Sequence, residues 1–589
     1  MRGKEQEPKG KERGASLLRT TLLALVLLAS IHTFGGTMVD FARYGYTPGS
    51  GKDARAALNQ ALTDCRAMRG ATLHLPKGRY DIHPTTNPDD AILFYRMNYF
   101  TLDAEGCDFV FHGMGRMFVV SQCSGITLRG FTTDSSRPAT TQATIVAVAD
   151  EWVDVSIDRD PYPYTIEDGH IAFTAPQWKK TAASFNLNLY DGQSHELVAH
   201  TNDSPLGTLF EGRAESQGDD VVRFHGHTPY RPTPGMKVAI HTQFQPWAGI
   251  TIDESRDVTL QDLRVYHSFG VGILATHTEN ITIDNAFAAA NEQKGRVFST
   301  VYDNAHFCNC RGLISIQHCA PTGMGDDAVN IHGCYYEVVD VRDRHTLTLR
   351  LKSADIGVGE ELWLVDSQSM QRTAVCKVMA TDVHTDSKGR TCTVKTEQPL
   401  PKGLRAGDYA ESKTWTPDVE IRHCQFGRKN RARAILVTTP GHVVIEDCTF
   451  ATAGAAILIE GDTNRYLESG GCNDVTISHN TFDNCLTASG SQPDAGWGDA
   501  VIAITPSTAT TTQYPPAGYH RNIRITDNDF LATHTPILLA RSTDGLTFSG
   551  NHIAPTDGHV PQPTPSTAIR TEGCRHVSVG SNQWPEGMR

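Results

Sequence analysis

Long hydrophobic runs are scarce in this sequence. The most apolar stretch, LLALVLLASI at residues 22–31, has ten residues, whereas a helix that spans a bilayer needs about 20. Basic residues precede this stretch, as is typical of an export signal; they are Lys9, Lys11, Arg13 and Arg19. We therefore predict a signal at residues 1–36, an exported chain (periplasmic, cell-surface or secreted), and no membrane contact beyond the signal, with an uncleaved anchor as the alternative.

Blocks of Lys and Arg are missing beyond the N-terminus. The chain carries a formal charge of −13 and has a pI near 6.0, which argues against nucleic acid as a partner. The sequence also has no Gly-rich phosphate loop, no loop like that of an EF-hand and no Ser or Cys at the spacing of a catalytic triad. We predict no cofactor and no bound metal. The composition, 39% hydrophobic and 20% charged, is that of a soluble globular protein.

A nine-residue phrase recurs along the chain. It begins at residues 125, 257, 280, 312, 418, 442, 474, 522, 545 and 576. Its second and fourth positions are apolar, which is the period of a β-strand; in the copy at 312 the pattern is shifted one residue later. Asn or Cys stands at the seventh position, or at the eighth in the copy at 312, in seven of the ten copies, which are Cys319, Cys424, Cys448, Asn480, Asn528, Asn551 and Asn582. A cysteine in that column is expected to be a small buried apolar residue, so the 14 cysteines do not require disulfides, although the status of Cys308 and Cys310 stays open.

One strand in every 23 or more residues, repeated in register, is the pattern of a parallel β-helix. Each coil shares its core with its neighbours, because a single coil cannot bury its inner face alone. We predict an all-β chain folded as a right-handed parallel β-helix. An amphipathic helix at residues 53–67 would cap the first coil and cover its open edge.

Two long stretches interrupt the repeat. Both contain short alternating strands and close with similar sequences, so we expect two related, small β-barrel-like insertions. The predicted organisation is a signal at 1–36, a cap and first coils at 37–138, insertion 1 at 139–249, coils with the candidate site at 250–334, insertion 2 at 335–415 and the last coils at 416–589. Both insertions leave the solenoid near Asp326 and are placed to wall in a site there.

Two adjacent acids, Asp326 and Asp327, break the repeat within GMGDDAVNIHG. The coil that begins at 442 has alanines in the equivalent segment, GAAILIEG. A solvated turn is the default interpretation of such a pair. The coil that begins at 442 shows that the fold needs only small residues at these positions. The replacement of small residues by two acids therefore favours a functional site.

A third acid, Asp303, lies 23 residues before Asp326. This spacing is about one coil, so Asp303 is expected to stack next to the pair, since neighbouring strands are about 4.8 Å apart. Crowded carboxylates cannot all ionise easily, and one pKa rises. Three acids on one patch of the outer surface therefore predict an acid and a base for glycoside hydrolysis. Asn330 and His332 follow at alternating spacing and are candidates for substrate binding, with a buried structural role as the alternative.

GDDAVNIHG with the upstream YDNAHFCNC, set on β-helix repeats with two β-rich insertions, resembles glycoside hydrolase family 110. This family comprises bacterial exo-acting α-1,3-galactosidases, including enzymes that remove the terminal galactose of the blood group B antigen. The resemblance implies an inverting mechanism without a metal, on an oligosaccharide or glycoconjugate substrate. It makes Asp326 the general acid, and it assigns Asp303 and Asp327, singly or together, to activating the water.

Other functions stay open from the sequence. A polygalacturonase of family 28 uses the same three-carboxylate logic on uronic acid polymers, but such a substrate favours a basic surface. A polysaccharide lyase would need Ca²⁺ and a basic residue, and a non-catalytic carbohydrate-binding β-helix would not need three clustered acids. The oligomeric state is not fixed, and a homodimer is among the arrangements that we consider.

Overall fold

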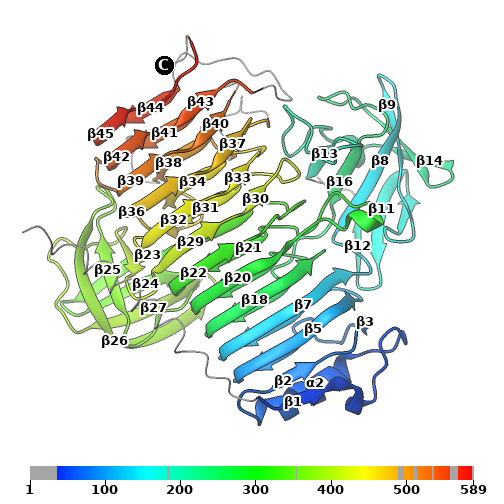
Figure 1. Cartoon of the computed structure of the whole chain (residues 1–589), viewed down its shortest axis with the longest axis horizontal. Coiled ribbons are helices and arrows are strands. Elements are labelled where there is room, and N and C mark those ends of the chain that lie inside the picture. Colours follow the sequence, from blue (N-terminus) through cyan, green and yellow to red (C-terminus); the bar gives the residue numbers. More distant parts are fainter. Residues whose placement is uncertain are drawn as a thin grey trace, which may run out of the picture.

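A computed structural model of the chain describes residues 36–181, 186–352, 354–488, 497–508, 514–532, 536–556 and 568–586. These residues form a solenoid of stacked β-coils that carries two lateral insertions (Figure 1). Apart from Gly36, the predicted export signal lies outside the described residues. Within them, no helix combines the length and the apolar character needed to cross a bilayer.

The solenoid consists of parallel sheets that run along its length, which confirms the predicted β-helix. All ten copies of the phrase supply strands of one sheet, namely β7 (Ser124–Ser135), β18 (Arg256–Val265), β20 (Glu279–Ala288), β22 (Arg311–Gln317), β29 (Pro417–Arg422), β32 (His442–Glu446), β36 (Asp474–Ser478), β39 (His520–Thr526), β42 (Thr543–Ser549) and β45 (Arg575–Gly580). Each pairs in parallel with the next, as Val443 of β32 does with Val475 of β36. In eight of the ten copies the second and fourth positions are buried in one continuous core. In the copy at 312 the buried residues are one position later, Ile314 and Ile316, and in the last copy Val577 and Val579 are exposed.

A second parallel sheet lies behind the first and positions the candidate site. It contains β4 (Ile92–Tyr95), β6 (Phe118–Ser121), β17 (Ile250–Asp253), β19 (Ile273–Thr276), β21 (Ala305–Cys308), β23 (Val329–Asp343), β31 (Ile435–Thr438), β34 (Ile457–Asp462), β38 (Ile502–Ser507), β41 (Leu538–Arg541) and β44 (Ile569–Glu572). A third, narrow sheet follows the phrase in the later coils, with β30 (Gln425–Phe426), β33 (Thr449–Phe450), β37 (Thr481–Asp483), β40 (Asp529–Leu531) and β43 (His552–Ala554).

The seventh position of the phrase forms a buried ladder of asparagines. Asn528 accepts a hydrogen bond from the backbone of Asn480 at 3.0 Å and donates one to the carbonyl of Ile477 at 2.9 Å. In the same way, the side chain of Asn551 accepts a hydrogen bond from the backbone N–H of Asn528 at 3.0 Å. The side chains thus satisfy backbone groups at a bend where the strands stop pairing.

Cysteines at the same position are buried and carry free thiols. Cys448 is an example, since its Sγ lies 3.7 Å from the carbonyl of Ile421. Cys308 and Cys310 do not pair with each other; the Sγ of Cys308 lies 3.2 Å from that of Cys334, and Cys310 faces the carbonyl of Ala275. The expectation that these cysteines act as small apolar residues therefore holds for the ladder.

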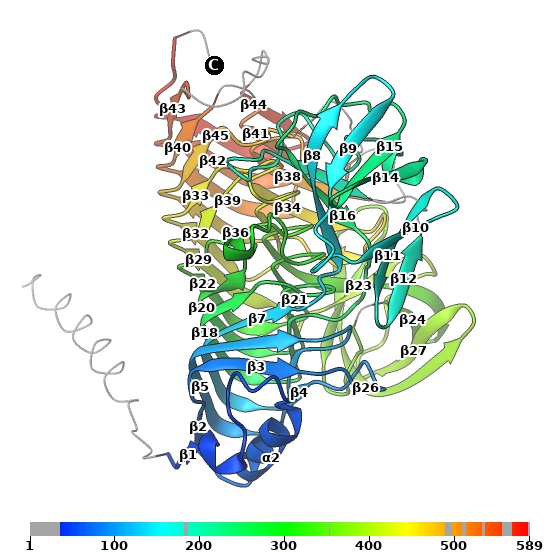
Figure 2. The same cartoon turned by 90° about the vertical axis from the view of Figure 1, so that its right-hand side faces the viewer.

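The predicted cap is helix α2 (Arg55–Arg66), slightly shorter than the expected 53–67. Its apolar face, with Leu58, Ala61 and Leu62, is buried in the solenoid core. Figure 2 shows it closing the N-terminal end of the solenoid.

Insertion 1 contains two antiparallel sheets with their own core. The larger has β13 (Leu187–Tyr190), β16 (Lys237–His241), β8 (Thr140–Val148), β9 (Trp152–Ser156), β15 (Val221–His225) and β14 (Ala214–Gly218) in that order. The smaller has β10 (Tyr164–Glu167), β11 (His170–Ala175) and β12 (Trp178–Thr181). Apolar side chains of both sheets share one cluster.

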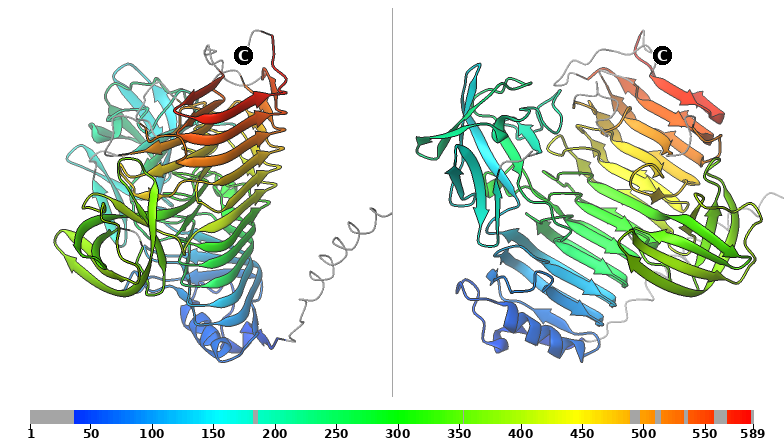
Figure 3. Two further views of the ribbon diagram at one scale, coloured as in Figure 1. Left: turned by 90° about the vertical axis from the view of Figure 1, so that its left-hand side faces the viewer. Right: turned by 180° about the vertical axis from the view of Figure 1, so that it is seen from behind.

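Insertion 2 is a closed antiparallel ring built onto the solenoid. The long strand β23 leaves the second sheet and pairs with β24 (Thr346–Leu351) and β28 (Tyr409–Ser412). The ring is completed by β25 (Glu361–Val365), β26 (Arg372–Asp386) and β27 (Gly389–Thr396). In Figures 1 and 3 the two insertions project from opposite edges of the solenoid.

Candidate active site

Three charged residues occupy equivalent positions in three consecutive coils. Asp303, Asp327 and Arg433 each stand two residues before a strand of the second sheet, and those strands pair Ala305 with Val329 and Val329 with Ile435. The stacking continues in the backbone, because the N–H of Asn304 donates to the carbonyl of Asp327 at 3.0 Å and the N–H of Ala328 donates to that of Arg433 at 3.1 Å. The coils therefore stack two aspartates and one arginine in a column.

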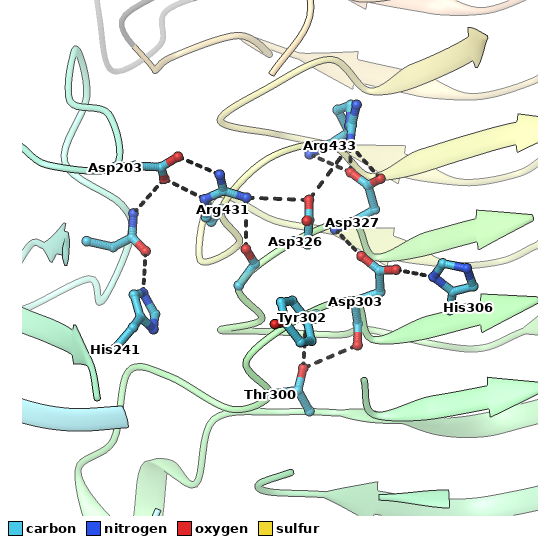
Figure 4. A network of polar contacts seen from close by, with 12 residues as sticks. Asp203, His241, Thr300, Tyr302, Asp303, His306, Asp326, Asp327, Arg431 and Arg433 are labelled. Carbon is cyan, nitrogen blue, oxygen red and sulfur yellow. Dashed lines mark hydrogen bonds and ion pairs between the residues drawn. The ribbon is translucent and has the colours of Figure 1, made fainter. Parts of the chain in front are cut away.

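Asp326 stands beside this column, stacked over Tyr302 of the preceding coil (Figure 4). The turn that presents it needs two glycines. Gly323 has φ +72°, in the region that favours glycine, and a Cβ on Gly325 would lie 2.2 Å from the carbonyl oxygen of Val301. The bend required by the sequence is therefore present, and the close approach to the coil below accounts for Gly325.

The three acids differ in exposure, which corrects the expectation of an outer-surface patch. The side chains of Asp303 and Asp327 are 7% and 1% exposed, whereas that of Asp326 is 38% exposed. An oxygen from each of the three lies within 4.8 Å of the others. The structure thus brings the predicted trio together, with two members covered and one open to solvent.

Asp327 is held by Arg433 through both of its oxygens. Nε donates to Oδ1 at 2.6 Å and a terminal nitrogen donates to Oδ2 at 2.8 Å. Burial raises the pKa of Asp327 to about 7, with the carboxylates of Asp326 and Asp303 adding to it and Arg433 opposing it. The carboxylates of Asp327 and Asp326 also raise the pKa of Arg433, against the effect of its burial.

Asp303 is fixed by one contact on each oxygen. Its Oδ1 accepts the backbone N–H of Asp327 at 3.0 Å, and its Oδ2 lies 2.6 Å from Nδ1 of His306. Burial, followed by the charges of Asp326 and Glu468, raises the pKa of Asp303 well above its usual value. Crowding therefore acts as the sequence predicted, but burial is the larger cause.

Insertion 1 reaches the site through Asp203. This residue accepts two hydrogen bonds of 2.5 Å from Arg431, and Arg431 also lies 3.4 Å from Asp326 (Figure 4). Arg431 further donates to the carbonyl of Gly325 at 2.9 Å. The insertion thus helps to orient the turn that carries Asp326.

Asn330 and His332, the predicted substrate-binding residues, lie on β23 behind the acids. Each is about 5% exposed. His332 contacts the Nε2 of His306 at 2.8 Å and the carbonyl of Gly333 at 2.6 Å. The structure brings both residues to the site but covers them, which favours the alternative of a buried role.

The donor atoms that lie close enough for a metal are already engaged. The oxygens of Asp303, Asp326 and Asp327 would fit around one ion by distance, but Arg433 takes both oxygens of Asp327. Cys308, His332 and Cys334 also lie together, but the ring nitrogens of His332 face a carbonyl and an imidazole. We identify neither group as a metal site.

Two exposed aromatic rings lie next to each other, and one of them, Tyr302, is beside the trio. Tyr302 precedes Asp303, and Phe244 comes from the end of insertion 1; their ring centroids are 6.1 Å apart. Burial and the charge of Asp326 raise the pKa of Tyr302, which places its ring within the field of that carboxylate. Aromatic rings with open faces beside carboxylates are a common platform for the apolar side of a sugar.

A cavity of about 550 Å³ lies away from the three acids. It is lined by Trp415 and Glu360 on one side and by residues of the first sheet, such as Arg311 of β22, on the other. The ring of Trp415 is already used: Arg311 lies 4.6 Å from its centroid and its Nε1 donates to Glu360 at 3.0 Å. Because these groups pair with one another, we assign no sugar to this cavity.

Sequence reasoning missed Arg431, Arg433, His306, Glu468 and Asp203. Asp327 and Arg433 are 106 residues apart in the chain with insertion 2 between them, which hides that they belong to consecutive coils. Aligning ARAILV with DDAVNI by the repeat would have placed Arg433 over Asp327. Asp203 carried no such signal, because it lies in an insertion outside the repeat.

Comparison with known proteins agrees with this geometry. Residues 141–238 match the family model described as GLAA-B beta-barrel domain I. The chain is 32% identical to alpha-1,3-galactosidase B of Bacteroides thetaiotaomicron, covering 96% of this chain and 94% of that protein. It is 30% identical to alpha-1,3-galactosidase A of Bacteroides fragilis, covering 90% and 89%.

Among solved structures, a family 28 exopolygalacturonase of Yersinia enterocolitica covers 93% of this chain and 79% of its own, at 11% identity and a TM-score of 0.34, too loose a match to support any conclusion about the reaction. The relatives at 30% and 32% identity match over nearly their whole length. The chain therefore belongs to the α-1,3-galactosidase family, glycoside hydrolase family 110.

Proposed function

We propose that this protein releases terminal α-1,3-linked galactose from glycans, acting from the chain end and with inversion at the anomeric carbon. The observation that carries the proposal is the stack of Asp303 and Asp327 in equivalent turns with Asp326 open beside them. Membership of the α-1,3-galactosidase family supports the linkage and the sugar. Linear α-1,3-galactosides and the fucose-branched blood group B determinant are the two substrate types to distinguish.

Asp326 is suited to protonate the departing oxygen. It is the exposed member of the trio, so a sugar that approaches from solvent meets it first. A positioned acid of this kind contributes about 10²–10⁴-fold to the rate. Asp303 and Asp327 lie behind it, where they activate the attacking water.

The stereochemical outcome is supported by how the carboxylates are engaged. Acid and base in inverting enzymes are typically about 6.5–9.5 Å apart, and the close oxygens here are nearer, within 4.8 Å. Retention would instead need a free carboxylate as nucleophile. Arg433 occupies both oxygens of Asp327, and Asp303 is bound by His306 and by the backbone. Neither is free to form a glycosyl ester, which favours attack by water.

A uronic acid polymer fits the site less well. Such a substrate needs an unpaired cation, and the two arginines beside the acids already pair with carboxylates, Arg431 with Asp203 and Arg433 with Asp327. We also propose that the chain is exported, on the strength of its N-terminal sequence.

The test is Asp326→Asn, assayed on Gal-α-1,3-Gal and on the fucose-branched B trisaccharide. We expect kcat to fall by about 10²–10⁴-fold with an unchanged circular dichroism spectrum. Asp447→Asn, at an exposed turn of a later coil, is the matched control and should keep full activity. NMR of the first-formed galactose should show the β-anomer; the α-anomer would overturn inversion, and near-normal activity of Asp326→Asn would overturn the acid assignment.

A further inference from the structure

A line of buried polar contacts leads away from Asp303 on the side opposite Asp326. Asp303 Oδ2 lies 2.6 Å from His306 Nδ1, and His306 Nε2 lies 2.8 Å from His332 Nε2. His332 Nδ1 lies 2.6 Å from the carbonyl oxygen of Gly333, and its Nε2 lies 3.7 Å from Glu468. The side chains of His332 and Glu468 are 5% and 15% exposed.

The hydrogen-bond partners fix where protons must lie. A carbonyl only accepts, so Nδ1 of His332 carries a hydrogen. The two Nε2 atoms at 2.8 Å need one hydrogen between them, and the contact of 2.6 Å between Asp303 and His306 needs another. Each contact can hold only one, because two hydrogens or two lone pairs would repel.

These three hydrogens exceed by one the number held by an ionised Asp303 and two neutral imidazoles. The surplus proton can occupy three sites. If it is on Asp303, both imidazoles are neutral; if it is on His306, that imidazole is charged beside an ionised Asp303. If it is on His332, Asp303 is ionised and His306 is neutral with its hydrogen on Nδ1. The proton moves between these sites by shifts along existing hydrogen bonds. Without it, two lone pairs would face each other in one of the two short contacts.

The charged groups around this line favour retention of the proton. Asp326, Asp327 and Glu468 face it as acids, the thiols of Cys308 and Cys334 lie within 4.8 Å of a ring nitrogen of His332, and Arg433 faces it as a cation. Burial raises the pKa of Asp303 and lowers that of His306, so burial alone would favour the proton on Asp303. The carboxylates of Glu468, Asp327 and Asp326 oppose the effect of burial on His306. Glu468, 3.7 Å from His332, supplies a negative charge at the opposite end of the line. Burial also raises the pKa of Glu468, but His332, His306 and Arg433 outweigh it and lower that pKa.

We propose that His306 and His332 are positioning residues that store a proton for Asp303 and so keep Asp303 ionised as the base of the hydrolysis. The inference rests on the proposed function. Before reaction the stored proton lies on His332, next to Glu468, and His306 donates to Asp303. Asp303 then takes a proton from water, the water oxygen bonds to the anomeric carbon, and the glycosidic bond breaks as Asp326 gives its proton to the departing oxygen.

Asp327 is less suited to this task, because the positive charge of Arg433, which binds both of its oxygens, lowers the affinity of this carboxylate for a proton. Asp303 Oδ1 has one contact, with the backbone of Asp327, and a carboxylate oxygen has a second lone pair for the proton of water. The histidines thus favour Asp303 over Asp327 as the base, a choice that the sequence left open.

The kinetic test uses His332→Gln and His306→Asn, assayed with Gal-α-1,3-Gal. The glutamine amide reaches the place of Nε2, and the asparagine amide reaches the place of Nδ1, but neither holds the stored proton. We expect kcat to fall about tenfold with KM nearly unchanged. In His332→Gln the acidic limb of the kcat/KM profile should move up by about one pH unit, since the proton then rests more often on Asp303; one unit corresponds to a tenfold change in proton affinity. His318→Gln, an exposed histidine paired with Asp284, is the control and should match the wild type.

A spectroscopic test separates this inference from the proposed function. In wild-type protein labelled with ¹⁵N-histidine at neutral pH, His306 and His332 should share one surplus proton and give a strongly downfield N–H resonance that His306→Asn removes. Two neutral imidazoles without that resonance would overturn the proposal, even if the variants do not fold. Unchanged kcat and pH profile in both variants would overturn it as well. If the wild type releases no galactose but shows the shared proton, the proposed function fails while the proton store stands.

Discussion

Replacing Arg433 with Met should leave Asp327 buried without its cation. The pair is joined by hydrogen bonds of 2.6 and 2.8 Å, and the Asp327 side chain is 1% exposed, so solvent cannot substitute for the lost charge. Breaking a buried pair by removing one partner costs about 3–5 kcal/mol. We expect a loss of this size in the free energy of unfolding at pH 8, measured by urea denaturation.

The cost should depend on pH in a defined direction. The pKa of Asp327 is about 7 in the folded chain against an ordinary value of 3.8, so the folded state binds this proton more tightly than the unfolded state. Stability from this group is therefore full below about pH 4 and is lost as the pH rises to about 7. Without Arg433 the folded pKa moves higher still, and the variant continues to lose stability above pH 7. At pH 5, where Asp327 is protonated in both proteins, the difference between them should shrink.

Two further variants identify the cause. Asp327→Asn combined with Arg433→Met removes the unpaired charge, so the double variant should recover most of the lost stability at pH 8. Arg422→Met removes a partly exposed coil arginine that pairs with Glu446 and should cost less than about 1 kcal/mol. An equal loss in Arg433→Met at pH 5 and pH 8, or a double variant no more stable than the single one, would refute the reasoning.

Three other predictions follow from the structure. Tyr302→Ala should raise KM for Gal-α-1,3-Gal about fivefold while Tyr302→Phe leaves it near the wild-type value, because an open ring beside Asp326 contributes about 1 kcal/mol by stacking; a lower kcat at constant KM would contradict this. Asn528→Ala should lower the free energy of unfolding by about 3 kcal/mol, since it strands a buried N–H and a buried carbonyl, whereas Asn59→Ala on the exposed face of the cap helix should change it little. Dialysis against EDTA should leave galactose release unchanged, because the carboxylate oxygens are engaged by Arg433 and His306, and loss of activity restored by Ca²⁺ would point to a lyase.

The solenoid was predictable because its information is local and repeated. Strand periodicity recurs along the copies of the phrase, and the Asn or Cys column recurs in seven of the ten. The asparagines of the column make the same contact from coil to coil, as between Asn528 and Asn551. The cap helix was predictable for the same reason, since its apolar face follows the helical period. Insertion 2 forms a closed ring because β23 extends beyond the solenoid and pairs with β24 and β28. No local sequence pattern predicts these pairings.

Part of the site was also present in the sequence. The departure of Asp326 and Asp327 from the repeat, one coil after Asp303, was sufficient to bring the three acids together. The sequence did not reveal how they differ, because burial depends on what covers each turn. Nor was Arg433 apparent without aligning the coils on either side of insertion 2, since it lies 106 residues after the acid that it neutralises.

By itself, then, the sequence determined the β-helix, its cap and the proximity of the three acids. In a regular solenoid, residues that are one coil length apart in the chain lie next to each other in space. The tertiary structure alone decided which acid is open, which is paired with Arg433 and which is linked to His306 and His332. It also decided that Asp203 of insertion 1 steadies the turn of Asp326. The contact of Asp203 joins a segment that no repeat relates to the site, and the contact of Arg433 joins coils that insertion 2 separates along the chain. Together these contacts give three similar carboxyl groups different chemical roles.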